Sequence, residues 1–273
     1  MNDGRYCMLF RMVVLAGLAV IAGCRSPLLP RQEYDDTVTH AGIIADLAGG
    51  RYEGFYAVSN LFRYGNHGLG TFDRLDGEMI IHSGRVYRAD VDGMLSAADP
   101  AVLTPFAVVT FFTPDRIFDI EQVGMERFHR AMDIRRTADL PEALEVNGRF
   151  SSITLRSVPA QDEPYVPLAQ VLERDQRMQT HTNLHGTMVG YYFPAELSAL
   201  HPAGYHWHFI DAERKTGGHV LDFTVQQARI AVDISPKVQV LLPETRPYRA
   251  VMIPVRPPGV GRTPRVSAPP VAD

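Results

Sequence analysis

Three histidines in the last third of the chain have types and spacing suited to metal binding. His206 and His208 lie two residues apart in an apolar run around the single tryptophan, and His219 follows a glycine pair further on. On a β-strand, residues two apart project from the same face, so both imidazoles can converge on one point. An antiparallel return would bring His219 beside them. Three neutral imidazoles suit Zn²⁺ and leave a position for water or substrate, as catalytic sites require.

Other histidines of the region lack this spacing. The chain has ten histidines, and we interpret His181, His185 and His201 as surface residues or as residues that support the ligands from behind. The alternative for His206 and His208 is a pair of surface histidines on a half-exposed strand. A third histidine after a glycine turn, with apolar residues flanking both strands, favours the metal site.

A carboxylate near a glycine-rich segment is a second candidate. The segment ends at Thr71, a turn is predicted at Asp76 and Gly77, and Glu78 heads the apolar run that follows. Glycine permits positive φ angles and close approach of backbones. The Glu78 carboxylate lies either at an exposed strand end or in a pocket, and spacing alone does not distinguish the two.

Strands dominate the elements that must position these residues. Residues 77–90 predict a hairpin with a glycine turn, and further strands are expected at residues 105–112, 150–158, 187–193, 205–210, 218–225, 229–234 and 238–242. Helices are expected at residues 41–48, at 119–132 with Asp119 as N-cap, and at 167–178 with proline in the first turn. Strands in runs with a few helices between them predict an α+β fold with mixed or antiparallel sheets.

Composition excludes several functional classes. The 273 residues carry a net charge of −4, and no stripe of basic residues is present, so nucleic-acid binding has no electrostatic basis. Two cysteines exclude a disulfide framework and a cysteine-rich zinc finger. No GxGxxG or Walker A motif supports a nucleotide site.

The N-terminus has the pattern of an export signal. A basic start precedes an apolar run from Met12 to Gly23, which is too short to span a membrane, and Cys24 completes a motif that resembles a bacterial lipoprotein box. The alternative is an ordinary signal peptide followed by a chance cysteine. We expect a signal peptide over 1–23, a tether over 24–39, one catalytic domain over 40–253 and a disordered, proline-rich tail over 254–273. The mature chain would then face the periplasm or the cell exterior, with a lipid at Cys24 as its only membrane contact.

Several segments, in order along the chain, resemble bacterial α-acetolactate decarboxylases. They are Gly68–Phe72, Leu75–Glu78, Thr104–Ala107, Arg156–Pro159, Pro164–Tyr165, Gly186–Gly190, Gly204–Phe209 and Gly217–Phe223. The last two carry the three histidines and are the most specific. The similarity extends over about residues 41–242.

The resemblance implies a carboxy-lyase that converts 2-acetolactate to acetoin and CO₂ through a metal-stabilised enediolate. It implies zinc on His206, His208 and His219, and catalytic roles for Thr71, Glu78, Arg156 and Glu244. The Arg156 guanidinium would hold the substrate carboxylate or a developing oxyanion, Thr71 would contact a substrate oxygen, and Glu78 or Glu244 would deliver a proton. The alternatives are a strand salt bridge for Arg156 and a solvated loop carboxylate for Glu244. It also implies two closely packed subdomains with mixed sheets, and pairing into a homodimer.

Two other functional classes compete with this hypothesis. A cupin-type oxygenase or isomerase is suggested by Glu213 after the histidine pair, but the second cupin motif is missing and His219 comes too soon. A non-catalytic zinc-binding lipoprotein would carry histidines in flexible tracts, whereas here they lie on apolar strands.

Overall fold

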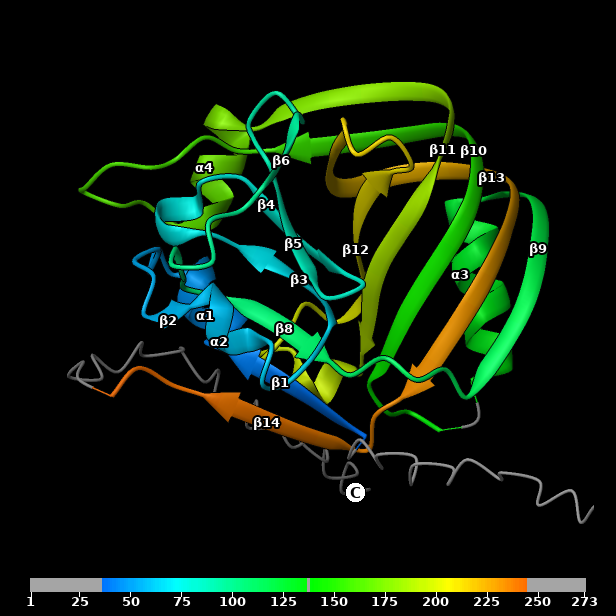
Figure 1. Ribbon diagram of the computed structural model, residues 1–273, viewed down its shortest axis with the longest axis horizontal. Helices are drawn as coiled ribbons and strands as arrows, with labels where there is room; N and C mark the ends of the chain where they lie inside the picture. Colours follow the sequence, from blue (N-terminus) through cyan, green and yellow to red (C-terminus); the bar gives the residue numbers. More distant parts are fainter. Residues whose placement is uncertain (1–35, 137, 245–273) are drawn as a thin grey trace, which may run out of the picture. The chain divides into compact units, whose positions relative to one another are not determined.

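The structure is a computed structural model that describes residues 36–136 and 138–244. Two β-sheets pack against each other within these residues (Figure 1). The expected signal peptide, the first part of the tether and the tail lie outside the described residues. No helix within the described residues is long and apolar enough to cross a membrane.

The first sheet has seven strands in the order β14-β1-β8-β3-β4-β5-β6. Its pairs are antiparallel except for β1 and β14, which run parallel, so the sheet is mixed. The strands are β1 (Thr37–Ala41), β3 (His67–Thr71), β4 (Glu78–His82), β5 (Arg85–Ala89), β6 (Leu95–Ala97), β8 (Ala107–Thr110) and β14 (Lys237–Leu241).

The second sheet has five longer, antiparallel strands in the order β10-β11-β12-β13-β9. They are β9 (Arg116–Gly124), β10 (Glu142–Ser157), β11 (Arg177–Phe193), β12 (Gly204–Asp211) and β13 (Gly217–Ile234). Because β10 pairs with β13 as well as with β11, these two pairings close four of the strands into a ring. The strongly bent strands are visible in Figure 1.

The helices are short. They are α1 (Ile44–Ala48), α2 (Val58–Leu61), α3 (Met125–Arg135) and α4 (Leu168–Asp175), with 3₁₀ turns at Asp73–Leu75 and Ala195–Leu197. A two-stranded ladder joins β2 (Tyr56–Ala57) to β7 (Leu103–Thr104).

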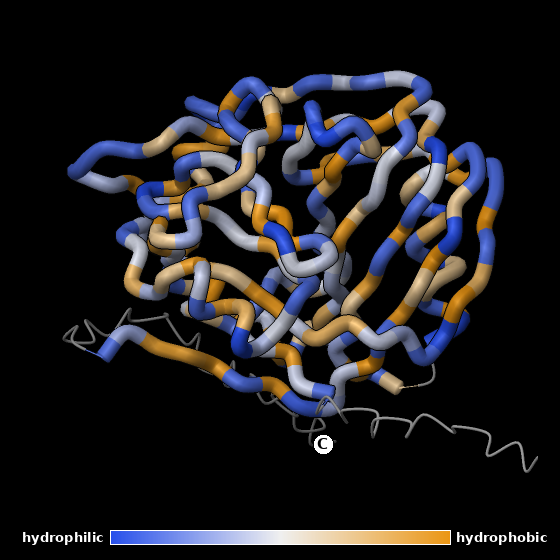
Figure 2. The backbone as a smooth tube through the Cα atoms, in the orientation of Figure 1, coloured by the Kyte–Doolittle hydropathy of each residue, from blue (hydrophilic) through white to orange (hydrophobic). Residues whose placement is uncertain are grey.

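Successive side chains along each strand project to opposite faces of the sheet, so position along the strand determines which side chains are buried. Buried and exposed positions alternate along much of β10 and β13, and hydropathy alternates with them (Figure 2). On β12, Trp207 and Phe209 join the core beneath α3, whereas Ile210 packs with Ile80 of β4 between the two sheets. The residues of β12 that share the parity of Ile210 therefore face the first sheet.

The predicted fold class is confirmed, together with most of the predicted strands. The hairpin expected at residues 77–90 forms as β4 and β5. The segments 218–225 and 229–234, expected as separate strands, are both parts of β13.

Several boundaries differ from the expectation, among them the start of the first helix, which is Ile44 rather than residue 41 because Ala41 ends β1. The helix predicted over 119–132 is wrong in its first half, because Asp119 lies in β9 and the helix begins only at Met125. Ladder hydrogen bonds to β13 satisfy the backbone of that segment instead. The tether is too long by three residues, since β1 begins at Thr37 and its Val38 is fully buried.

Candidate active site

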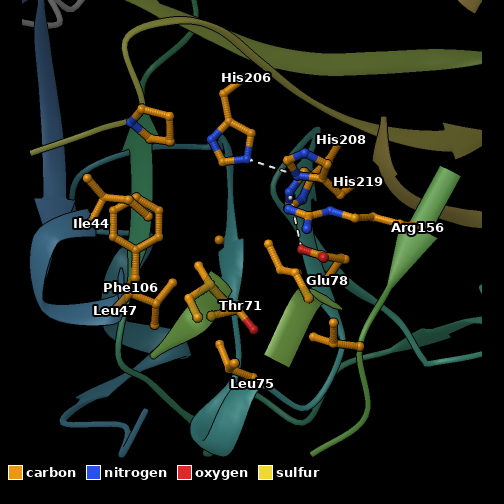
Figure 3. Close-up of a pocket in the computed structure, with 15 residues that line it drawn as sticks. Ile44, Leu47, Thr71, Leu75, Glu78, Phe106, Arg156, His206, His208 and His219 are labelled. Atoms are coloured by element: carbon orange, nitrogen blue, oxygen red, sulfur yellow. Dashed lines mark hydrogen bonds and ion pairs between the residues drawn. The ribbon is translucent and has the colours of Figure 1, made fainter. Parts of the chain in front are cut away.

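A cavity of about 170 Å³ lies where the two sheets meet α1 and α4. One side is polar and contains all three candidate metal ligands together with Thr71, Glu78 and Arg156 (Figure 3). The other side is apolar. The structure thus brings together six of the seven residues that the sequence suggested.

A single cross-strand row explains why three of these residues meet. His208 of β12 lies opposite His219 of β13, and His219 lies opposite Arg156 of β10 on its other side. Directly opposed residues project from the same face of a sheet. His206 joins them because it lies two residues from His208, as the strand spacing predicted.

The turn between β12 and β13 sets this register. The Asp211 carboxylate accepts hydrogen bonds from the backbone N–H groups of Lys215 and Thr216 at 2.7 and 2.8 Å. Gly218 then has a φ of 150°, and a Cβ there would lie 2.8 Å from the Arg156 carbonyl oxygen. Only glycine fits this position, so the strand carrying His219 approaches β10 closely.

The three imidazoles fit a metal ion. One nitrogen from each lies within 4.8 Å of the others, and Nε2 of His206 is 3.2 Å from Nδ1 of His219. Two ligands of a tetrahedral zinc, each at about 2.0–2.1 Å, would be separated by about 3.3 Å. His208 donates its Nδ1–H to the Met79 carbonyl at 2.8 Å, and its buried Nε2 has no hydrogen-bond partner among the described residues.

Electrostatics also favour a metal. Burial lowers the pKa of His208 to about 4 and those of His206 and His219 well below their usual value. All three imidazoles are therefore neutral near pH 7 and offer lone pairs, as metal ligation requires.

Glu78 projects into the cavity from the first residue of β4. Its side chain is buried, and one carboxylate oxygen lies 3.3 Å from His208 Nε2. Burial raises the pKa of Glu78 to about 7, although the nearby Arg156 guanidinium partly opposes the shift. The preceding Gly77, with φ of 83°, completes the turn that aims this carboxyl at the second sheet. The pocket alternative for Glu78 is the one that the structure adopts.

Thr71 and Arg156 offer complementary hydrogen-bonding groups. The Thr71 hydroxyl donates to the Gly77 carbonyl at 2.8 Å, so toward the cavity it offers lone pairs that accept hydrogen bonds. The buried Nε of Arg156 has no partner within the part of the chain that the structure describes. A guanidinium with a free donor in a small cavity is suited to a carboxylate.

The apolar side of the cavity was missed at the sequence level. Ile44 and Leu47 of α1, Leu168 and Leu172 of α4, and Phe106 line it. Four of these five residues form apolar pairs, three residues apart in α1 and four residues apart in α4. This helical spacing is the sequence signal from which they could have been predicted.

Glu244 is the one predicted catalytic residue away from this group. It follows β14, is exposed and does not line the cavity, so its role stays a prediction. His181 is half-buried and His185 exposed, in agreement with surface positions. His201 is fully buried behind His206, which agrees with a supporting position.

The chain is similar to known proteins in sequence and in structure. The model of the family described as "Alpha-acetolactate decarboxylase" matches residues 38–254. A curated relative of that name from Methylococcus capsulatus is 36% identical, with 79% of this chain and 83% of the relative covered. The crystal structure of alpha-acetolactate decarboxylase from Bacillus subtilis strain 168 superposes with a TM-score of 0.75 at 32% identity, covering 77% of this chain and 90% of that one.

Proposed function

Since the chain belongs to the alpha-acetolactate decarboxylase family, we propose that it decarboxylates 2-acetolactate to acetoin and CO₂ at the cavity between its sheets. The observation that carries this proposal is the convergence of three neutral histidines, Arg156 and Glu78 on one small space. Family membership favours this carboxy-lyase over the cupin and zinc-carrier alternatives.

Zinc on His206, His208 and His219 is the second part of the proposal. The nitrogen separations, and the buried Nε2 of His208 that makes no hydrogen bond within the described residues, support a metal, and three imidazoles with an open position favour Zn²⁺. When bound, the metal supplies a Lewis acid beside the substrate oxygens, which stabilises negative charge developing there.

The chain's own residues bind and orient the substrate. Arg156 is the cationic side chain of the cavity lining and pairs with the substrate carboxylate. Because the Thr71 proton is already donated to Gly77, the Thr71 oxygen accepts from the tertiary hydroxyl of the substrate. The apolar side chains of α1 and α4 exclude water and receive the methyl groups.

Proton delivery completes the reaction. The C–C bond to the carboxylate breaks and CO₂ leaves. The electron pair of that bond stays with the substrate and is delocalised onto the neighbouring ketone oxygen, which gives an enediolate. One proton must then be added to carbon to give acetoin. The raised pKa of Glu78 supports its role as this donor, because a general acid must carry its proton near the working pH. Glu244 has no comparable support in its exposed position.

Export and anchoring remain part of the proposal on sequence grounds. We propose a signal peptide over residues 1–23 and a lipid on Cys24, which keep the enzyme outside the cytoplasm. A homodimer likewise follows only from the family resemblance.

The decisive experiment measures CO₂ release and acetoin formation from racemic 2-acetolactate. Activity should disappear after treatment with a chelator and return with stoichiometric Zn²⁺, and His206→Ala should abolish both zinc binding and activity. His185→Ala, at an exposed position on β11, is the matched control and should retain both. A folded, zinc-loaded protein that releases no CO₂ would refute the function.

A further inference from the structure

Two buried histidines extend behind the metal-ligand candidate His206 and do not reach the cavity. His206 Nδ1 lies 3.1 Å from His201 Nε2, and His201 Nδ1 lies 3.4 Å from His40 Nε2. Neither His201 nor His40 has any exposed surface. The three rings form a chain that runs from the second sheet to β1, which lies next to the edge strand β14 of the first sheet.

Ligation fixes the direction of every hydrogen bond in this chain. A metal ligand must present a lone pair, so Nε2 of His206 is unprotonated and its Nδ1 carries the proton. That proton is donated to His201 Nε2. His201 must then carry its own proton on Nδ1 and donate it to His40 Nε2, which leaves the His40 proton on Nδ1.

We infer that His201 and His40 are positioning residues that hold His206 in the tautomer and ring orientation required for metal binding. The inference rests on the proposed metal site and deepens it. Partners of this kind orient the ring and raise the basicity of the coordinating nitrogen, as carboxylates and carbonyls do behind other metal-bound histidines.

An apolar side chain packs against both His201 and His40. These two histidines can therefore orient His206 through hydrogen-bond direction rather than through charge. The His201 ring stacks on Phe193 with centroids 4.5 Å apart, and the His40 ring meets the edge of Phe193 at 5.1 Å. Burial lowers the pKa of His40 to about 3. A neutral imidazole has one donor and one acceptor, which is what a member of such a chain requires.

The far end of the chain leaves one buried ring nitrogen without a partner. His40 Nδ1 is buried and has no hydrogen-bond partner within residues 36–136 and 138–244. A buried donor without a partner is costly and uncommon, and an aliphatic or phenyl side chain would fill the same space without that cost. The hydrogen bond to His201 is the interaction that a histidine at this position adds.

Zinc affinity provides the main test, measured by competition with a chromophoric chelator rather than by activity. His201→Phe removes the acceptor for His206 Nδ1–H and keeps the ring that stacks on Phe193. We expect it to weaken zinc binding about 10- to 100-fold, the range found for such partners. His201→Gln, whose amide oxygen can accept the same proton, should restore most of the affinity. His40→Phe should lower affinity less than His201→Phe, and His185→Phe is the surface control.

A second measurement requires no variant. In the zinc-loaded wild type, histidine ¹⁵N chemical shifts should show His206, His201 and His40 all protonated at Nδ1. Protonation of any of them at Nε2, or a folded His201→Phe protein that binds zinc as tightly as wild type, would overturn the inference and leave the function standing. If His201→Phe does not fold, His40→Phe and the ¹⁵N shifts decide. A folded wild type that binds no zinc would overturn the metal proposal and this inference together.

Discussion

Replacing Glu78 by glutamine tests the proposed proton donor with little change in shape. The side chain is 8% exposed, and an amide occupies the same space as a carboxyl group. It cannot transfer a proton to carbon in the way that a carboxylic acid does. The three histidines and Arg156 keep their positions, because strand pairing rather than Glu78 sets them.

The expected loss follows from the role of a general acid. Such a group contributes about 10²- to 10⁴-fold to rate, which corresponds to about 2.7–5.4 kcal/mol of transition-state stabilisation at about 1.36 kcal/mol per tenfold. We therefore expect kcat of Glu78→Gln to fall by about 10²- to 10⁴-fold. KM should change little, because the proposed carboxylate contact belongs to Arg156.

The pH dependence of the wild type carries the same reasoning. The protonated form of Glu78 is the active one, so kcat/KM, which reports the free enzyme, should decrease as pH rises through the pKa of Glu78. Burial raises that pKa to about 7, and a bound metal cation lowers it from there. The midpoint of the decrease should therefore lie at or below about 7, and Glu78→Gln should lose this transition.

The assay is continuous CO₂ release over a range of 2-acetolactate concentrations, which gives kcat and kcat/KM, with zinc content measured for each preparation. Glu121→Gln, an exposed glutamate on β9, is the matched control, and Glu244→Gln tests the other candidate donor. A zinc-loaded Glu78→Gln enzyme with kcat near wild type would refute the assignment. A large loss in Glu244→Gln alone would transfer the role to that residue.

Three further predictions concern the substrate contacts and the N-terminus. Arg156→Lys should lower kcat/KM by about tenfold to 150-fold, the equivalent of a charged hydrogen bond worth about 1.5–3 kcal/mol; an unchanged value would show that the guanidinium does not hold the carboxylate. Leu172→Ala widens the apolar side of the cavity. It should raise the kcat/KM for 2-aceto-2-hydroxybutyrate relative to 2-acetolactate about fourfold, because burying one additional methylene contributes about 0.8 kcal/mol. An unchanged ratio would show that α4 does not contact the alkyl group of the substrate. Cys24→Ser should abolish incorporation of labelled palmitate, and labelling that persists would contradict the lipid anchor.

The histidine cluster could be predicted from sequence because its geometry is local. Two histidines two residues apart and a third beyond a tight turn need only strand spacing and one antiparallel pairing, and β12 and β13 provide both. Glu78 was ambiguous because its orientation depends on which face of β4 the second sheet covers. His40 lies 161 residues from His201, and no local pattern connects such positions.

The error at residues 119–132 has a local physical cause. Ile120 and Val123, three residues apart, both pack into the core beneath α3, which imitates helical spacing. Gln122 between them adopts a φ of 52°, which breaks the alternation of the strand and lets both side chains face inward. Sequence periodicity does not distinguish this distortion from the first turn of a helix.

The cross-strand row of His208, His219 and Arg156 has a consequence for insertions and deletions. Side chains alternate along a strand, so a register slip of one residue turns every side chain to the opposite face. One residue added or removed between Asp211 and Gly217 would direct His219 into the core beneath α3 and remove it from the cavity. A peptide tag or a fused domain should therefore be placed in other surface loops, because this turn tolerates substitution more readily than a change of length.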